Sequence, residues 1–408
     1  MSKWEEKRLE DIIDVNPPVK LKKGESYPFI DIDKVSPTRR SVTNDEVKVY
    51  DGQSSSKFCD GDTVFSRITP CLENRKIAKV SIKEDAAFGS TEFYVFRAKK
   101  KKADARFTYY LTSSDVVVLP AINSMTGASG RQRADKRFIQ RLKLNLPDLP
   151  TQERIADILS AYDDLIEANN RRIELLEQAA QELYKEWFVR FRFPGHENTK
   201  FENGLPEGWG YVRFGKAIDI IDGDRGANYP KQEEFYPEGD CLFLNAGNVT
   251  SKGFDFSACS YITKEKDSIL RKGKLQHGDV VLTTRGTVGN VAFYNDTMTF
   301  SEMRINSGMV ILRNLGVVSP EYIYTALRHE YLQKLMTLYA SGSAQPQLPI
   351  KDMKRMKIIK ADEKTMKRFT EMSADIYNQI SLLIMKNQTL AKQRDMLLPR
   401  LMSGKLEV

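Results

Sequence analysis

The chain has 408 residues, a formal net charge of +8 and a pI near 9.0. This length exceeds what one ordinary hydrophobic core accommodates, so it predicts at least two domains. The basic excess suits a polyanionic partner, but it equally suits a basic protein that binds none. The 4 cysteines include no CxxC pair, which argues against a zinc knuckle or a disulfide framework and favours a reducing cytoplasm.

The N-terminal segment alternates charged and apolar residues and lacks the apolar stretch of a secretory signal. No apolar run of the length needed to cross a bilayer follows it. We therefore expect a protein that is neither secreted nor membrane-spanning.

Taken in chain order, the sequence is written twice, which makes an internal repeat its main organising feature. Trp4 precedes a short apolar segment, and Trp209 precedes a similar one. Residues 60–67 return as 277–285, and each segment predicts a Gly-Asp turn that leads into a strand ending on arginine. The loop at 126–133 returns as 341–347. Each half therefore predicts a domain of mixed α/β structure.

Each half ends in a long helical pattern, predicted at 151–191 and at 363 to about 398. Apolar residues recur there with the alternating spacing of four and three that is typical of a coiled-coil seam. We therefore expect the two helices to pack against each other, and to do so antiparallel if a pseudo-twofold axis relates the two halves. The first seam consists of Ile155, Leu159, Tyr162, Ile166, Asn169, Ile173, Leu176, Ala180, Leu183 and Trp187. The second consists of Phe369, Ser373, Ile376, Ile380, Leu383, Asn387, Leu390, Arg394 and Leu397.

These patterns predict four successive parts. A first mixed α/β domain covers 1–149, and a central spacer helix covers 150–192. A connection rich in Gly, Pro, Asn and Glu opens the third part, 193–361, which holds the second mixed domain. The fourth part, 362–408, contains the C-terminal spacer helix and a tail. The fold class expected is a two-repeat α/β (α+β) protein whose halves are related by a pseudo-twofold axis.

The segment 149–156, Leu-Pro-Thr-Gln-Glu-Arg-Ile-Ala, resembles the central conserved region of the specificity subunits of type I restriction-modification systems, the HsdS family. The resemblance continues through 169–173 and Trp187-Phe188, while 397–406 is similar to the C-terminal conserved region and 205–209 to the entry of the second recognition domain. One departure is visible, because the second helix lacks the Pro-x-x-x-Gln-Glu entry of the first.

The resemblance implies two target-recognition domains that each read one half of a bipartite, asymmetric site in double-stranded DNA, with the paired helices setting the spacing. It also implies two modification (methyltransferase) subunits that methylate adenine, and restriction subunits that supply the motor and nuclease. The chain itself would then be non-catalytic and would need no cofactor. Two rival interpretations are a fused methyltransferase or nuclease and a coiled-coil scaffold that does not read DNA.

Motifs that imitate an enzyme are weak. Asn16-Pro17-Pro18 resembles the start of the adenine methyltransferase signature, but Val19 replaces the aromatic residue that would stack on an extruded base. The fifteen residues before it are too few for a nucleotide-binding βαβ unit. The sequence also has no P-loop, and its three histidines are scattered. An ordinary Pro-Pro turn is the alternative that we favour.

The repeated loops are the best candidates for base reading, because small residues allow close approach while Arg and Gln can fork onto guanine and adenine. A solvated flexible loop is the alternative. The loop candidates are Ser129, Arg131, Gln132 and Arg133, and Ser343, Gln345 and Gln347. Further candidates for base or phosphate contact, with simple surface solubility as the alternative, are Arg67, Arg75, Lys76, Arg285, Thr287 and Asn290.

Asn169 and Asn387 interrupt the two apolar seams. If the helices pack antiparallel about a pseudo-twofold axis, the repeat offset places these two residues opposite each other. A paired polar residue in a seam lowers stability but fixes register. We therefore expect this pair to set the helix register.

Overall fold

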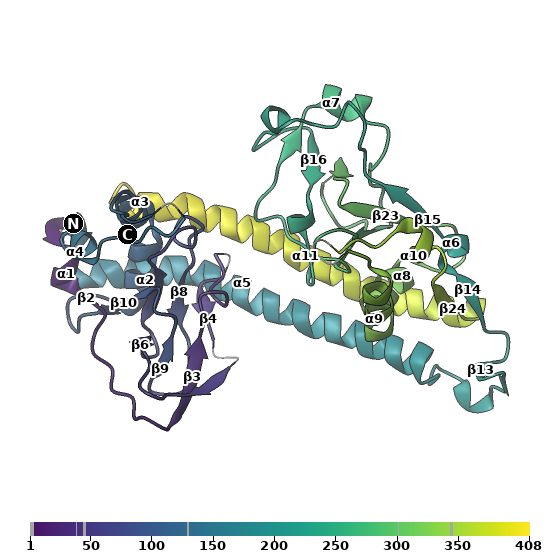
Figure 1. Cartoon of the computed structure of the whole chain (residues 1–408), viewed down its shortest axis with the longest axis horizontal. Helices are drawn as coiled ribbons and strands as arrows, with labels where there is room; N and C mark the ends of the chain where they lie inside the picture. Colours follow the sequence, from purple (N-terminus) through teal and green to yellow (C-terminus); the bar gives the residue numbers. More distant parts are fainter. Residues whose placement is uncertain (1–3, 38, 44–45, 129, 301, 343–345) are drawn as a thin grey trace. The chain divides into compact units, whose positions relative to one another are not determined.

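The computed structural model describes residues 4–37, 39–43, 46–128, 130–300, 302–342 and 346–408. The chain forms two compact units (Figure 1). Unit 1 runs to Glu167 and also takes Thr389–Val408, and unit 2 is Ala168–Gln388. This division cuts both long helices, whereas the boundaries predicted from the sequence set each helix apart as a segment of its own.

In unit 1, a sheet of order β2-β10-β7-β8-β4 lies beside a second one of order β5-β3-β9-β6, and β1 pairs with β11. Helices α2 and α3 follow β10 and pack against the first sheet through residues such as Phe107 and Val117. The strands are β1 (Trp4–Arg8), β2 (Ile13–Val15), β3 (Ser26–Ile30), β4 (Ser41–Val42), β5 (Val47–Val49), β6 (Ser56–Phe58), β7 (Thr63–Ser66), β8 (Ile77–Val80), β9 (Ala87–Gly89), β10 (Phe93–Ala98) and β11 (Lys143–Pro147). The short helices are α1 (Leu9–Ile12), α2 (Ala105–Ser113), α3 (Asp115–Asn123) and α4 (Lys136–Gln140).

Unit 2 repeats this layout, with a sheet of order β15-β23-β20-β21, a smaller sheet β19-β16-β22 and the pair β14-β24. Its strands are β12 (Phe201–Glu202), β13 (Leu205–Pro206), β14 (Gly210–Arg213), β15 (Ile218–Asp222), β16 (Cys241–Leu244), β17 (Val249–Thr250), β18 (Gly253–Phe254), β19 (Tyr261–Ile262), β20 (Asp279–Thr283), β21 (Val291–Tyr294), β22 (Met303–Ile305), β23 (Met309–Asn314) and β24 (Lys357–Lys360). Its short α-helices are α6 (Phe214–Ala217), α7 (Lys264–Ile269), α8 (Pro320–Arg328), α9 (Glu330–Tyr339) and α10 (Ile350–Met353).

The repeat is visible in matching hydrogen bonds as well as in strand order. A buried aspartate opens each central strand and receives two hydrogen bonds from an arginine of the neighbouring strand, Asp62 from Arg97 and Asp279 from Arg313. Each carboxylate also accepts the backbone N–H three residues before it, at 2.7 Å in both units. The two domains of mixed α/β structure predicted from the sequence are therefore confirmed.

The two long helices are α5 (Leu149–Tyr184) and α11 (Glu363–Met402). The first ends in a π-helical turn, η1 (Lys185–Val189), so helical structure stops shortly before the predicted end at 191. The second continues past Pro399 to Met402, beyond the end that the sequence predicted at about 398. Each helix starts alike, because the side chain of Asp148 accepts the N–H of Thr151 and that of Asp362 accepts the N–H of Thr365. These caps fix the repeat offset of the helices at 214 residues.

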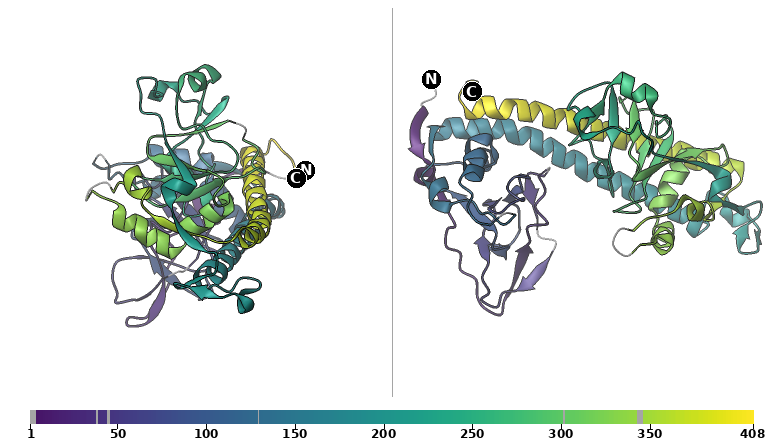
Figure 2. Two further views of the ribbon diagram at one scale, coloured as in Figure 1. Left: turned by 90° about the vertical axis from the view of Figure 1, so that its right-hand side faces the viewer. Right: turned by 45° about the horizontal axis from the view of Figure 1, so that its top comes forward.

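Within each unit the two helices run antiparallel and side by side (Figure 2). In unit 2, Trp187 near the end of the first helical segment contacts Phe369 near the start of α11, with ring centroids 5.9 Å apart. In unit 1, Ile155 near the start of α5 belongs to the same buried cluster as Leu401 near the end of α11. The antiparallel helix pair, expected for two halves related by a pseudo-twofold axis, is therefore confirmed.

Candidate nucleic-acid interface

The loop at 126–133 is a closed hairpin rather than an open segment. Thr126 and Arg133 exchange both backbone hydrogen bonds, at 3.1 and 2.9 Å. Gly127 and Gly130 have φ values of 126° and 76°, which favour glycine at both positions. A Cβ atom on Gly127 would lie 3.3 Å from the carbonyl oxygen of Arg131. The turn itself therefore favours the two glycines of this loop, which the sequence analysis had linked to close approach of DNA.

The base of this hairpin is fixed to the chain that follows β7. Ala134 donates its N–H to the carbonyl of Arg67 at 2.8 Å, and Thr69 donates to the carbonyl of Gln132 at 3.0 Å. The N–H of Gln132 in turn donates to Oγ1 of Thr69 at 3.1 Å. The hairpin therefore has a rigid base and an exposed tip, which is the geometry required of a reading element.

Three charged side chains meet at this base. Both Nε and Nη2 of Arg133 donate to the two carboxylate oxygens of Glu92, at 2.9 and 2.7 Å. The Nε of Arg67 donates to the same carboxylate at 3.2 Å, and its guanidinium lies over the ring of Tyr94. The hydrogen bonds from Arg133, together with the charges of both arginines, hold the pKa of Glu92 below its usual value.

The candidate residues of unit 1 therefore differ in how many of their side-chain donors are already bound within the unit. Arg131 is exposed and has no ion-pair partner among the described residues, whereas one edge of the Arg133 guanidinium is occupied. Arg75 donates to the carbonyl of Ser113 and pairs with Asp115, and the ammonium of Lys76 donates to a backbone carbonyl at 3.0 Å. Ser129 lies outside the described residues.

Unit 2 builds the same hairpin from other residues. Ser341 and Gln347 exchange backbone hydrogen bonds at 2.9 and 2.8 Å, and Leu348 donates to the carbonyl of Thr284 at 2.9 Å. Gln347 also bridges to Arg285, as Arg133 bridges to Ile68 in unit 1. Ser343 and Gln345 lie outside the described residues.

These bridges correct the alignment of the two halves. Residue 284, a threonine, takes the place of Arg67, and Arg285 takes the place of Ile68. The two arginines therefore do not end their strands at equivalent positions, because the second segment carries one residue more before its arginine. The strand pairing gives the same alignment, because Ser66 pairs with Phe93 in unit 1 and Thr283 pairs with Met309 in unit 2.

The remaining candidates of unit 2 have scaffold contacts. The amide of Asn290 donates to the carbonyl of Val249 at 3.0 Å, and the carbonyl of Thr287 accepts from the hydroxyl of Thr283. The Nε of Arg285 is buried without a hydrogen-bond partner among the described residues. Gln347 is exposed. In this unit the side chain of Asn290 is tied to the scaffold, whereas Gln347 is exposed and Arg285 has an unused donor among the described residues.

The two seam asparagines are in contact within unit 2. The Nδ2 of Asn169 donates to Oδ1 of Asn387 at 2.7 Å, and the Nδ2 of Asn387 donates to Oδ1 of Asn170 at 2.9 Å. All three side chains are partly buried. The contact between Asn169 and Asn387 that the repeat offset predicted for an antiparallel pair is therefore present.

Two buried carboxylates of α5 that the sequence reasoning missed are each paired with an arginine and link this helix to the domain of their unit. In unit 1, Asp163 of α5 accepts hydrogen bonds from Tyr110 of α2 and from Arg394 of α11. In unit 2, Glu177 of α5 accepts from Tyr324 and Arg328 of α8. The repeat could not reveal either pair, because neither carboxylate recurs at the equivalent position of the second helix. The residue equivalent to Asp163 is Tyr377, and the residue equivalent to Glu177 is Ala391.

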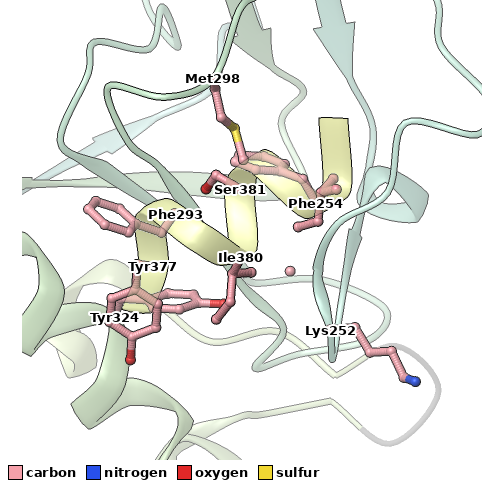
Figure 3. Close-up of a pocket in the computed structure, with 10 residues that line it drawn as sticks. Lys252, Phe254, Phe293, Met298, Tyr324, Tyr377, Ile380 and Ser381 are labelled. Carbon is pink, nitrogen blue, oxygen red and sulfur yellow. The ribbon is translucent and has the colours of Figure 1, made fainter. Parts of the chain in front are cut away.

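A small cavity lies between the sheet of unit 2 and α11 (Figure 3). Its volume is about 20 Å³, and its walls include Phe293, Tyr324, Tyr377 and Ile380. This is room for a single water molecule. The described residues hold no cluster of His, Cys, Asp or Glu that could bind a metal ion. No described helix combines the length and apolar character needed to cross a bilayer.

Comparison with known proteins gives one consistent family. The sequence model of the type I restriction modification DNA specificity domain matches residues 1–178 and 206–382. The MjaIX specificity subunit of a type I restriction enzyme of Methanocaldococcus jannaschii is 24% identical, over 99% of this chain and 94% of that protein. The HindI specificity subunit of Haemophilus influenzae is 22% identical, over 88% of this chain and 90% of that protein.

A solved structure shares the fold. The S subunit of a type I restriction-modification system from M. genitalium superposes with a TM-score of 0.54 at 14% identity, covering 98% of this chain and 96% of that chain. The two family matches coincide with the two halves of the repeat described above. The chain therefore belongs to the family of type I restriction-modification DNA specificity proteins.

Proposed function

We propose that this chain is the non-catalytic DNA-recognition subunit of a type I restriction-modification complex, and that each unit reads one half of a bipartite, asymmetric site. The observation that carries the proposal is the pair of equivalent hairpins, each fixed to the central sheet and each presenting Arg or Gln side chains. Guanidinium and amide groups can donate to or accept from purine edges in the major groove.

The reading residues differ between the units under this proposal. Arg131 and Gln132 are the base contacts of unit 1, and Arg285 and Gln347 those of unit 2. Arg75 and Lys76 are second choices for phosphate contact, since both must first leave partners of their own unit. Two modification subunits methylate adenine in the bound site and restriction subunits cleave DNA. The pair Asn169 and Asn387 fixes the helix register and so the spacing of the two half-sites. A cytoplasmic location accords with the four free cysteines.

Mapping methylated adenines tests the proposal in the complete complex. The wild-type subunit, together with its modification subunits, should methylate one bipartite sequence. Gln132→Ala should relax that sequence in one half only, and Gln347→Ala in the other half only. Arg137→Ala, a charge removal at an exposed residue of unit 1 outside the hairpin, is the control and should leave the map unchanged. A map that is insensitive to both hairpin variants would contradict the assignment of the reading residues, and a wild-type complex that methylates no particular sequence would favour the scaffold interpretation.

A further inference from the structure

Glu92 is the acidic residue at the centre of the unit 1 hairpin base, and its carboxylate pairs with two arginines there, Arg67 and Arg133. It accepts two hydrogen bonds from Arg133 and one from Arg67, and its side chain is 21% exposed. The side chain of Arg133 is 45% exposed, so this ion pair lies at the surface that carries the hairpin. A carboxylate in this position works against the binding of a phosphate backbone.

The equivalent place in unit 2 has no carboxylate. Arg67 donates its N–H to the carbonyl of Glu92 at 2.9 Å, and Thr284 donates to the carbonyl of Gly308 at 2.8 Å. Gly308 therefore occupies the position of Glu92, and Gln347 occupies that of Arg133. The hairpin closes and keeps its backbone contacts in both units. The carboxylate is thus not required to fold a hairpin of this kind.

The negative charge of Glu92 affects how strongly the neighbouring arginines attract phosphate groups. Lys and Arg contacts to phosphate supply sequence-independent affinity, and each such contact adds about one unit to the salt dependence of binding. The two arginines would be free to make such contacts if Glu92 did not pair with them. Contacts to base edges, in contrast, carry the sequence information. A residue that suppresses the first kind of contact raises the ratio between binding to the target and binding to other sequences.

We propose that Glu92 is a specificity-determining residue of unit 1, which withholds Arg67 and Arg133 from the phosphates of non-target DNA. The inference rests on the proposed function, since it assumes that unit 1 reads DNA through its hairpin. It also revises the expectation for Arg133. That side chain already has its Nε and Nη2 edge on Glu92, so only its outer edge, with Nη1 and the second Nη2 hydrogen, is left for DNA while the ion pair lasts.

Charge-removing and charge-conserving variants separate this role from a structural one. Glu92→Gln keeps the size of the side chain but loses its charge, and Glu92→Asp keeps the charge. Glu84→Gln removes the same charge at an exposed position of unit 1 and serves as the control. Each variant is assembled with the modification subunits, and binding is measured over a range of salt concentrations. The probes are a duplex with the methylation-mapped site and a duplex with that site scrambled.

The expected result is that Glu92→Gln binds the scrambled duplex roughly three- to tenfold more tightly and with a salt slope steeper by about 1 to 2. The ratio of target to scrambled affinity should fall, while Glu92→Asp and Glu84→Gln stay near wild type. Equal loss of binding to both duplexes by Glu92→Gln, with an unchanged slope, would mean that Glu92 only supports the hairpin and would overturn the inference. A wild-type complex that binds both duplexes alike would overturn the proposed function and this inference together.

Discussion

Units 1 and 2 share the same backbone framework but carry different polar side chains at the hairpin base and at the helix contact. The pairing of Asp62 with Arg97 recurs as Asp279 with Arg313, because it stabilises a turn that both sheets need. At the hairpin base, however, Glu92 is replaced by a glycine, and at the helix contact a different carboxylate is used in each unit. The comparison teaches that the fold constrains the sheet interior, while the hairpin and the helix contacts are free to diverge.

The strongest test of this comparison is to remove the arginine from each buried ion pair. Arg394→Met leaves the 3% exposed Asp163 without its cation, and Arg328→Met does the same to the 8% exposed Glu177. We expect each to lower the free energy of unfolding by about 3–5 kcal/mol, since an unpaired buried charge remains. Urea titration of the purified chain measures this.

The double variant Asp163→Asn with Arg394→Met is the control for unit 1. It should recover most of the lost stability, because no unpaired charge is then left in the buried site. Stability losses below about 1 kcal/mol for both single variants would show that these pairs behave like ordinary surface ion pairs. A loss in one unit alone would show that only that unit depends on its ion pair.

A second test concerns the hairpins. Arg131→Ala should weaken binding to the unit 1 half-site, and Gln347→Ala to the unit 2 half-site, each by about 1–3 kcal/mol if these are base contacts. Competition binding of the assembled complex, with duplexes altered in one half-site at a time, measures the effect. Equal weakening on the target and on a scrambled duplex would contradict the assignment of base contacts.

A third test addresses the polar interruption of the helix seam in unit 2. Asn169→Leu together with Asn387→Leu should raise the stability by about 1 kcal/mol, because partly buried amides are replaced by apolar side chains that suit a seam. It should also loosen the register, so that methylation at sites with altered spacing increases. Thermal melting and methylation mapping measure the two effects. A double variant that melts below wild type would contradict the proposal that the amides trade stability for register.

The smallest expected effect is a difference in pH dependence between two glutamates. Burial raises the pKa of Glu177 despite Arg328 and Tyr324, whereas the pairing with Arg133 and Arg67 lowers that of Glu92. The stability from Glu177 is therefore complete below the unfolded pKa, near 4.5, and is lost as pH rises through the folded value. The stability from Glu92 is present above that unfolded pKa and is lost as pH falls through the folded value.

The free energy of unfolding of Glu177→Gln and of Glu92→Gln, each compared with wild type between pH 4 and 8, tests these signs. A pKa shift of one unit changes that free energy by about 1.4 kcal/mol at most. Raising the pH should make Glu177→Gln more stable relative to wild type and Glu92→Gln less stable. Parallel pH profiles for the two variants would contradict the contrast between the buried and the surface carboxylate.

The sequence by itself determined the repeat, the two domains of mixed structure and the antiparallel helix pair. These features follow from periodicities of apolar residues and from turn residues, which act over short distances along the chain. It also singled out Asn169 and Asn387, because a polar residue in an apolar seam is conspicuous. The family resemblance rested on the same helices, whose sequence is constrained over many successive turns.

Only the tertiary structure decided which residues meet at the hairpin base. Glu92 lies 41 residues from Arg133 in the chain, and its counterpart in the repeat is a glycine, so no local pattern and no repeat pointed to it. The one-residue difference before Arg285 also became visible only through the strand register. The ion pair of Asp163 with Arg394 spans 231 residues. Such contacts depend on how elements pack, since a side chain at the end of one strand or helix acquires its partner only when the others are in place.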